Sequence, residues 1–364
     1  MRIAYLNSYL SNVADSDLLH PTLDHPLHHF WGADVLRQRG HEIIWLELNS
    51  KSLLGRAADK LTRIHRGRLG NLEVDLRTLH AAAAADVLYL PVANIMALPL
   101  LRAVRAIKTP VVTWIYAPPP DAPAWRPTSW RHQPPYLRGL DGLMCLTSAA
   151  EAFFKPRMPH ALVETVDWCG DPRYAEAGIR YEPFALCAGR TNRDYATLVA
   201  AAPYVRGQVR LICPPEAVAG LALPKNLQLI AASSPTQPFL VTYRDLMQQH
   251  YAAARCIVIP LVPNPLETAG LTNLMEAMHM GKPSVTTRTG CLDVDVDALR
   301  IGRSVPAKDP RAMADAINAY LDDEAAARAA GARAKALADE RFSPERFGAS
   351  VERFLAEVVQ RTGR

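Results

Sequence analysis

The sequence lacks the cysteine patterns of disulfide-rich and zinc-binding proteins. Its six cysteines stand singly, and no two of them have the Cys-x-x-Cys spacing. Histidines and cysteines do not cluster at the spacing of metal ligands either. In a chain of 364 residues we therefore expect reduced thiols, as in the cytoplasm, and no bound metal.

Long hydrophobic runs are also missing. The longest apolar region, 81–104, is interrupted by an aspartate, an asparagine and two prolines. It cannot supply the roughly 20 consecutive apolar residues of a membrane span. Residues 1–6 predict a strand directly, with no charged segment before an apolar one, so we expect no signal peptide and a cytoplasmic protein.

The chain has only a small excess of positive charge. The chain has 41 Lys and Arg against 36 Asp and Glu, a formal net charge of +5. A protein held on nucleic acid by charge would show a larger and more clustered excess, so no nucleic-acid partner is expected. One basic segment, 51–68, has apolar residues near helical spacing. It predicts either a solvated helix covering a sheet or a peripheral contact with an anionic membrane.

Short apolar runs alternate with helical patterns along the whole chain. Several runs are apolar without alternation, as in strands of a parallel sheet that is covered on both faces. The predicted strands are 3–6, 43–48, 86–90, 111–115 and 142–146 in the first half, and 184–188, 209–212, 227–230, 256–261 and 284–287 in the second.

The helices between these strands complete two α/β halves. A helix is predicted over 27–39, and Asp309-Pro310 and Ser343-Pro344 are typical helix starts. The polar stretch 167–183 predicts a linker. We therefore expect two Rossmann-like domains joined near residue 178, with ligands at the carboxyl ends of the strands, in the cleft between the domains.

The segment 261–291 has the most informative pattern, LVPNPLETAGLTNLMEAMHMGKPSVTTRTGC. It predicts a strand, a loop with Gly270, and a helix that begins near Leu271 and carries Glu276. A glycine at a helix start lets a ligand approach the free N–H groups, where the helix dipole favours an anion. Glu276 could accept hydrogen bonds from sugar or ribose hydroxyls. A βα loop with solvated glutamates would give the same pattern.

Three motifs of the second half resemble the retaining glycosyltransferases of family 4 (glycosyl transferases group 1). LMEAMHMGKPSVTT is similar to the family's LLEAMACGKPVVAT segment. FALCAGRTNRDYATLVA resembles the opening of its second domain, and IGRSVPAKDPRAMADAINAYL resembles its G-x-x-V-x-x-x-D-P-x-x-L-A-x-A-I stretch. The resemblance covers about 184–360, whereas the first half matches only in general pattern.

This resemblance implies an α/β protein of the GT-B fold, with two Rossmann-like domains facing across a cleft. Residues 1–178 would form an acceptor-binding domain and 179–345 a donor-binding domain. The C-terminal helix, 346–364, would pack back on the first domain.

The resemblance also implies a donor site for a nucleotide-sugar. The implied donor-binding residues are Gly189, Arg190, Arg193, Gly270, Leu271, Thr272 and Glu276. The arginines would hold the diphosphate with bidentate contacts, backbone N–H groups at the helix start would complete the phosphate site, and Glu276 would bind the ribose. A UDP-sugar is the expected donor, with GDP- and dTDP-sugars as alternatives, and the reaction needs no cofactor and no metal.

One departure from the family concerns the sugar. The family has two glutamates separated by seven residues, whereas here Glu267 and Glu276 are separated by eight. Either a one-residue bulge before Gly270 restores Glu267 to the sugar as a catalytic residue, or Thr268, at the family spacing, faces the sugar instead.

The first half departs further. Relatives have a Gly-Gly loop after the first strand, whereas 7–26 contains no glycine. Four histidines lie in this region and at the following helix start, and His25 is the candidate for a contact to phosphate or acceptor. A packed or solvated histidine is the alternative. The loop 117–136, rich in proline and aromatic residues, could wall the acceptor site or pack on itself.

The sequence thus predicts a retaining, metal-independent glycosyltransferase. Its acceptor is an unidentified hydroxyl on a glycan, a lipid-linked molecule or a small molecule, and its oligomeric state is undetermined. The alternative is a catalytically silent sugar-nucleotide-binding or scaffold protein of the same fold. An epimerase would need acid and base residues that we do not find, and a nicotinamide dehydrogenase would need a GxGxxG after a strand.

Overall fold

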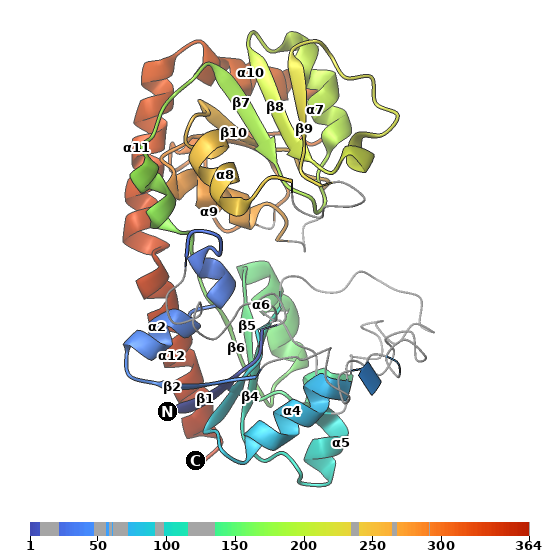
Figure 1. The fold of residues 1–364 in the computed structure, drawn as a ribbon, viewed down its shortest axis with the longest axis vertical. Coiled ribbons are helices and arrows are strands. Elements are labelled where there is room, and N and C mark those ends of the chain that lie inside the picture. The colour runs from blue at the N-terminus through green and yellow to red at the C-terminus, as the bar shows by residue number, and fades with distance from the viewer. Residues whose placement is uncertain are drawn as a thin grey trace. The chain divides into compact units, whose positions relative to one another are not determined.

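The computed structural model divides the chain into two compact units (Figure 1). Unit 1 comprises Met1–His20, His29–Val166 and Glu345–Arg364, and unit 2 comprises Pro21–His28 and Asp167–Pro344. The structure describes residues 1–7, 22–46, 56–57, 60, 72–91, 98–115, 135–233, 240–263, 268–290 and 292–363. Glu267, almost all of the loop 117–136 and most of the basic segment 51–68 therefore lie outside the described residues.

Unit 1 is built on a six-stranded sheet in the order β2-β1-β3-β4-β5-β6, and each registered pair is parallel. Its strands are β1 Arg2–Tyr5, β2 Glu42–Trp45, β3 Val87–Tyr89, β4 Val111–Ile115, β5 Gly142–Cys145 and β6 Leu162–Thr165. Its helices are η2 Leu27–Phe30, which begins in unit 2, α2 Ala33–Gln38, α4 Leu72–Ala82, α5 Leu98–Ala103, η4 Pro135–Gly139, α6 Ser148–Phe154, η5 Lys155–Arg157 and α12 Pro344–Arg361.

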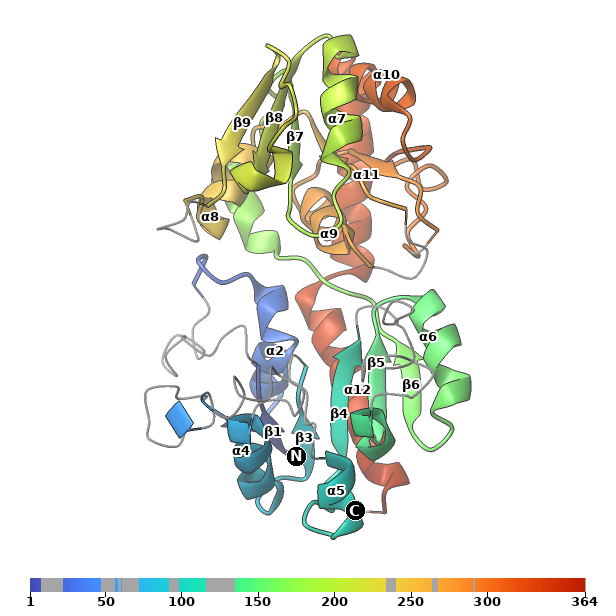
Figure 2. The ribbon, with the colours of Figure 1, turned by 90° about the vertical axis from the view of Figure 1, so that its right-hand side faces the viewer.

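The two faces of this sheet bury different helices. On one face, apolar residues of β1, β3, β4 and β5 pack with α4, α5 and α6. On the other face α12 runs alongside the strands (Figure 2). A Cβ added at Gly142 of β5 would lie 2.7 Å from Phe354 and 2.8 Å from Val358, so only a glycine lets α12 approach the strand this closely. The C-terminal helix therefore packs on the first sheet.

The predicted helix over 27–39 is interrupted. Trp31 and Gly32 have φ angles of 51° and 79°, which lie in the left-handed region and separate η2 from α2. At Gly32 an added Cβ would also lie 3.3 Å from the Gly348 backbone of α12. The prediction of one continuous helix was wrong because the periodicity of apolar residues does not reveal two left-handed residues.

Unit 2 contains a second six-stranded parallel sheet, in the order β12-β11-β10-β7-β8-β9. Its strands are β7 Phe184–Ala188, β8 Gln208–Cys213, β9 Leu227–Ala231, β10 Cys256–Ile259, β11 Ser284–Thr287 and β12 Gly302–Val305. Its helices are η6 Pro172–Ala177, α7 Tyr195–Ala201, η7 Ala202–Tyr204, η8 Pro215–Val218, α8 Tyr243–Asp245, the π-helical η9 Leu246–Tyr251, α9 Leu271–His279, α10 Pro310–Leu321 and α11 Glu324–Arg341.

One core cluster of unit 2 packs its sheet against the helices α7, α10 and the start of α11. The helix starts follow the sequence signals, since Asp309 caps α10 by accepting from Ala312 N and Pro310 is its first residue. The stretch 167–183, predicted as a polar linker, is instead packed into this unit, because Trp168, Cys169 and Tyr174 are buried.

All ten predicted strands are present, and the described residues contain two further strands that the sequence did not predict. The missed strands, β6 and β12, lie at one edge of each sheet. Edge strands carry polar residues that interrupt an apolar run, as Glu164 does in β6 and Arg303 in β12. Among the described helices, none is both long enough and apolar enough to cross a membrane.

Candidate functional site

The carboxyl end of β7 positions an arginine against a glycine. Gly189 follows the strand with a φ of 145°, and a Cβ added there would lie 2.6 Å from Nε of Arg193. The guanidinium of Arg193 therefore packs directly on the Gly189 backbone, and it donates a hydrogen bond of 2.6 Å to the carbonyl of Thr191. Arg190, one residue after the glycine, is exposed. Both arginines thus stand on the loop between β7 and α7.

A second loop, which follows β10, is tied to the first by main-chain hydrogen bonds. Asp194 N donates to Pro260 O at 3.0 Å, and Val262 N donates to Asn192 O at 3.0 Å. The same loop reaches β11, because Leu261 N donates to Oγ1 of Thr287 at 3.0 Å. The carboxyl ends of β7, β10 and β11 are therefore fixed to one another.

Helix α9 begins at this loop. Gly270 has a φ of 90°, and an added Cβ would lie 2.9 Å from Ile259. The helix then starts with Leu271 and Thr272, as the sequence predicted. The N–H group of Leu271 donates to the carbonyl of Thr268 at 3.1 Å, so this turn already uses one of the N–H groups expected to meet a phosphate.

Glu276 lies in α9 and is 4% exposed. Its Oε1 accepts a hydrogen bond from the hydroxyl of Tyr243, and its Oε2 accepts one of 3.1 Å from Nδ2 of Asn273. The same amide nitrogen donates to the hydroxyl of Tyr251 at 2.8 Å. Burial raises the pKa of Glu276, although these three side chains and the charge of Arg193 act in the opposite direction.

One connected network results. Arg193 donates to Oδ1 of Asn273, and Asn273 donates to Glu276, which also accepts from Tyr243. We call these four side chains the α9 network. It links the arginine expected at the diphosphate to the carboxylate expected at the ribose, within one unit.

The sequence located part of this site. It singled out Gly189, Arg193, Gly270, Leu271 and Glu276, which the structure brings together around two loops and one helix. It missed Asn273 and Tyr243. Asn273 stands three residues before Glu276 on the same helix face, and this spacing is a local signal. Tyr243 is 33 residues from Glu276 and has no such signal.

The histidine candidate lies in a segment that packs with unit 2. Residues 22–28 are held there by Leu27 N, which donates to Oδ2 of Asp171 at 3.0 Å, and by Tyr174, whose hydroxyl donates to Leu23 O at 2.7 Å. The carbonyl of His25 accepts a bond of 3.3 Å from Arg173. Among the described residues, the ring of His28 lies near the α9 network, with its centroid 5.9 Å from that of Tyr243.

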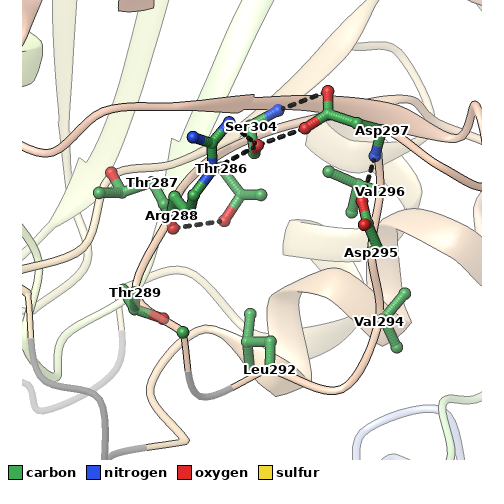
Figure 3. Close-up of a pocket in the computed structure, with 11 residues that line it drawn as sticks. Thr286, Thr287, Arg288, Thr289, Leu292, Val294, Asp295, Val296, Asp297 and Ser304 are labelled. Atoms are coloured by element: carbon green, nitrogen blue, oxygen red, sulfur yellow. Dashed lines mark hydrogen bonds between the residues drawn. The ribbon is translucent and has the colours of Figure 1, made fainter.

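A cavity of about 340 Å³ lies at the carboxyl end of β11 (Figure 3). Arg288 crosses one side of it and donates to Oγ of Ser304 at 3.0 Å, and Ser304 in turn donates to Asp297. Its lining residues are Thr286, Thr287, Arg288, Thr289, Gly290, Leu292, Val294, Asp295, Val296, Asp297 and Ser304. Four hydroxyls, one guanidinium, two carboxylates and three apolar side chains make this a lining that suits a polar, sugar-sized ligand.

Metal ligands do not gather in the part of the chain that the structure describes. No group of three or more histidine, cysteine, aspartate or glutamate side chains is placed there to hold an ion. The positive charge available at the carboxyl ends of β7 and β10 is that of Arg190 and Arg193.

The comparisons with known proteins agree with the motifs. Residues 182–323 match the family model described as glycosyl transferases group 1. A search of curated protein sequences found no match. Among solved structures, sucrose-phosphate synthase from Thermosynechococcus elongatus is similar, with a TM-score of 0.66 and 15% identity over 99% of this chain and 100% of that one.

Two further solved structures are similar over nearly their whole length. HepE of Anabaena in complex with UDP-glucose has a TM-score of 0.63 and 15% identity, over 98% of this chain and 100% of that one. A glycosyltransferase from Rickettsia africae has a TM-score of 0.60 and 12% identity, over 99% and 98%. At these identities the likeness shows the fold. The resemblance stated from the motifs is therefore confirmed: residues 182–323 are similar to glycosyl transferases group 1, and the chain as a whole has the GT-B fold.

Proposed function

We propose that this protein is a retaining glycosyltransferase that moves a sugar from a nucleotide-sugar, most simply a UDP-sugar, to an acceptor hydroxyl. The observation that carries the proposal is the α9 network. It connects an arginine at the end of β7 to a buried carboxylate in α9, within the residues that match the family. The similar HepE structure contains UDP-glucose, which supports a uridine nucleotide as the donor.

The proposed chemistry depends on charge at the diphosphate. Transfer leaves a nucleoside diphosphate that carries growing negative charge, while the sugar passes through an oxocarbenium-like state. Arg190 and Arg193 supply fixed positive charge for that leaving group, and preorganised charge of this kind is commonly the largest contribution to catalysis. Because arginines meet the diphosphate, we propose that no metal ion is required. In the retaining reaction, the departing phosphate would accept the proton of the acceptor hydroxyl.

The contact to the sugar is proposed for one of two neighbours. Thr268 is buried, and its carbonyl holds the turn before α9. Glu267 precedes it and lies outside the described residues. Either side chain would hold a sugar hydroxyl next to the phosphate site, and the catalytic assignment of Glu267 and His25 stays a prediction.

Nucleotide binding by the purified protein tests this proposal. We expect titration calorimetry to show binding of UDP, and Glu276→Gln to weaken it about tenfold, because a charged acceptor of ribose hydroxyls becomes neutral. Arg311→Ala is the matched surface control, since its guanidinium lies 3.3 Å from the ring centroid of Tyr204 on another helix. Absence of binding by UDP, GDP and dTDP alike would contradict the proposed function.

A further inference from the structure

The Glu276 carboxylate, which we propose binds ribose, already accepts a hydrogen bond from a hydroxyl of the protein. Oε1 of Glu276 accepts the hydrogen bond of the Tyr243 phenol. Burial and the neighbouring carboxylate raise the pKa of Tyr243 well above its usual value, so the phenol keeps its proton and acts as the donor. A ribose hydroxyl would approach the same carboxylate as the same kind of group, an O–H that donates to a carboxylate oxygen.

Tyr243 is the least buried of the partners of Glu276. Tyr251 is fully buried and Asn273 is 9% exposed, whereas Tyr243 is partly exposed. Glu276 itself is 4% exposed, so a ligand cannot contact its carboxylate while every partner stays in place. The most accessible route to Glu276 is therefore the one that Tyr243 occupies.

Aromatic packing holds the Tyr243 ring. Its centroid lies 5.5 Å from that of Tyr174 and 5.9 Å from that of His28. The residue is the first of the short helix α8, and Thr242, not Tyr243, caps that helix through its own side chain. Rotation about the side-chain torsions of Tyr243 can therefore remove the hydroxyl from Glu276 without breaking the cap.

We infer that the Tyr243 hydroxyl is an internal substitute for a ribose hydroxyl, which occupies Glu276 in the free protein and leaves it when the donor nucleotide binds. This inference rests on the proposed function, because it takes Glu276 as the ribose-binding residue. Donor binding then exchanges one hydrogen bond to the carboxylate for another. The exchange keeps Glu276 satisfied in both states and lowers the net affinity for the nucleotide.

The direction in which one substitution changes the affinity for UDP tests the inference. Tyr243→Phe removes the competing hydroxyl and keeps the ring, so UDP should bind about threefold to tenfold more tightly to the variant than to the wild type. A residue that merely supports Glu276 would have the opposite effect, because its loss would weaken UDP binding. Tyr320→Phe, a buried tyrosine of α10, is the matched control and should leave UDP affinity unchanged.

A double-mutant cycle supplies the second measurement. We expect Glu276→Gln to weaken UDP binding more in the Tyr243→Phe background than in the wild type, because there the carboxylate meets ribose without giving up a partner. Weaker or unchanged UDP binding by Tyr243→Phe, in a variant with the wild-type circular dichroism spectrum, would overturn the inference and leave the proposed function intact. Failure of the wild type to bind UDP, GDP or dTDP would overturn the proposed function itself.

Discussion

Both sheets are parallel and six-stranded, but they differ in strand order and in the side chains at the carboxyl ends of their strands. At the carboxyl ends of β1 and β3, the hydroxyls of Tyr5 and Tyr89 donate to the carbonyls of Phe30 and Trp31 at 2.7 and 2.8 Å. At the carboxyl end of β7, the corresponding place in unit 2 holds the charged α9 network. Neutral hydroxyls bonded to main-chain carbonyls fix a fold, whereas a guanidinium and a carboxylate can exchange their partners for a ligand. The comparison predicts that substitutions in unit 1 change stability and those in the α9 network change binding.

Trp114→Ala should have the largest effect and should change stability. Trp114 is buried on β4, where its ring lies 5.1 Å from that of Trp31 and 5.5 Å from that of Phe347, and its Nε1 donates to Tyr89 at 2.7 Å. Removing a buried tryptophan costs about 3–5 kcal/mol of unfolding free energy. Urea unfolding measures this loss.

A matched substitution controls for the removal of an indole ring. Trp45, on the edge strand β2, is only partly buried, and Trp45→Ala should cost less than Trp114→Ala. Equal losses of unfolding free energy in the two variants, or a loss below about 1 kcal/mol for Trp114→Ala, would contradict the stabilising role assigned to Trp114.

The two arginines of the loop after β7 separate effects on binding from effects on stability within unit 2. Both Arg193→Ala and Arg190→Ala should weaken UDP binding, by about tenfold to a hundredfold for Arg193, because a charge-assisted contact to phosphate is lost. Arg193→Ala should also lower stability, by about 1–3 kcal/mol, since Asn273 and buried Glu276 lose a cationic partner. Calorimetry and urea unfolding of both variants separate the two effects. Unchanged UDP affinity in both would remove the assignment of this loop to the diphosphate.

Lys282→Met should give an effect that depends on pH. Lys282 is 1% exposed and donates to the carbonyl of Ala252 at 2.9 Å and to that of Arg180. Burial, with repulsion from Arg180 and Arg328, lowers the pKa of Lys282 from 10.5 to about 7. Between these values the unfolded chain binds the additional proton, so the unfolding free energy contributed by Lys282 increases as pH rises, by up to about 1.4 kcal/mol per pH unit.

The variant isolates this contribution because methionine does not titrate. Urea unfolding of the wild type and of Lys282→Met, measured across the window between the two pKa values, should show a difference that shifts in favour of the wild type as pH rises. Parallel curves for the two proteins would show that Lys282 is not buried as a titrating group in the folded state.

The sequence was sufficient to predict those elements whose structure follows from a local pattern of residues. Apolar runs located ten strands, among them the edge strands β2 and β9, and the Gly-Arg and Gly-Leu-Thr motifs predicted both loops of the candidate site. Strands β6 and β12 were missed because Glu164 and Arg303 interrupt their apolar runs. The stretch 167–183 was wrongly predicted as a linker because its three buried apolar side chains, Trp168, Cys169 and Tyr174, have no helical or strand spacing. The sequence did not reveal the role of Tyr243, because only the fold brings α8 beside α9.

The segments that make up each unit determine which parts of this chain can be exchanged as modules. Neither unit is a continuous stretch, since the chain passes from one to the other after His20, His28, Val166 and Pro344. A fragment 167–344 would contain every residue of the α9 network yet would lack the segment that satisfies Asp171 and Tyr174. A fragment 1–166 would lack the helix that fills the groove at Gly142. A chimera that exchanges the nucleotide-binding half with a relative should therefore transplant residues 21–28 together with 167–344, and keep α12 with its own sheet.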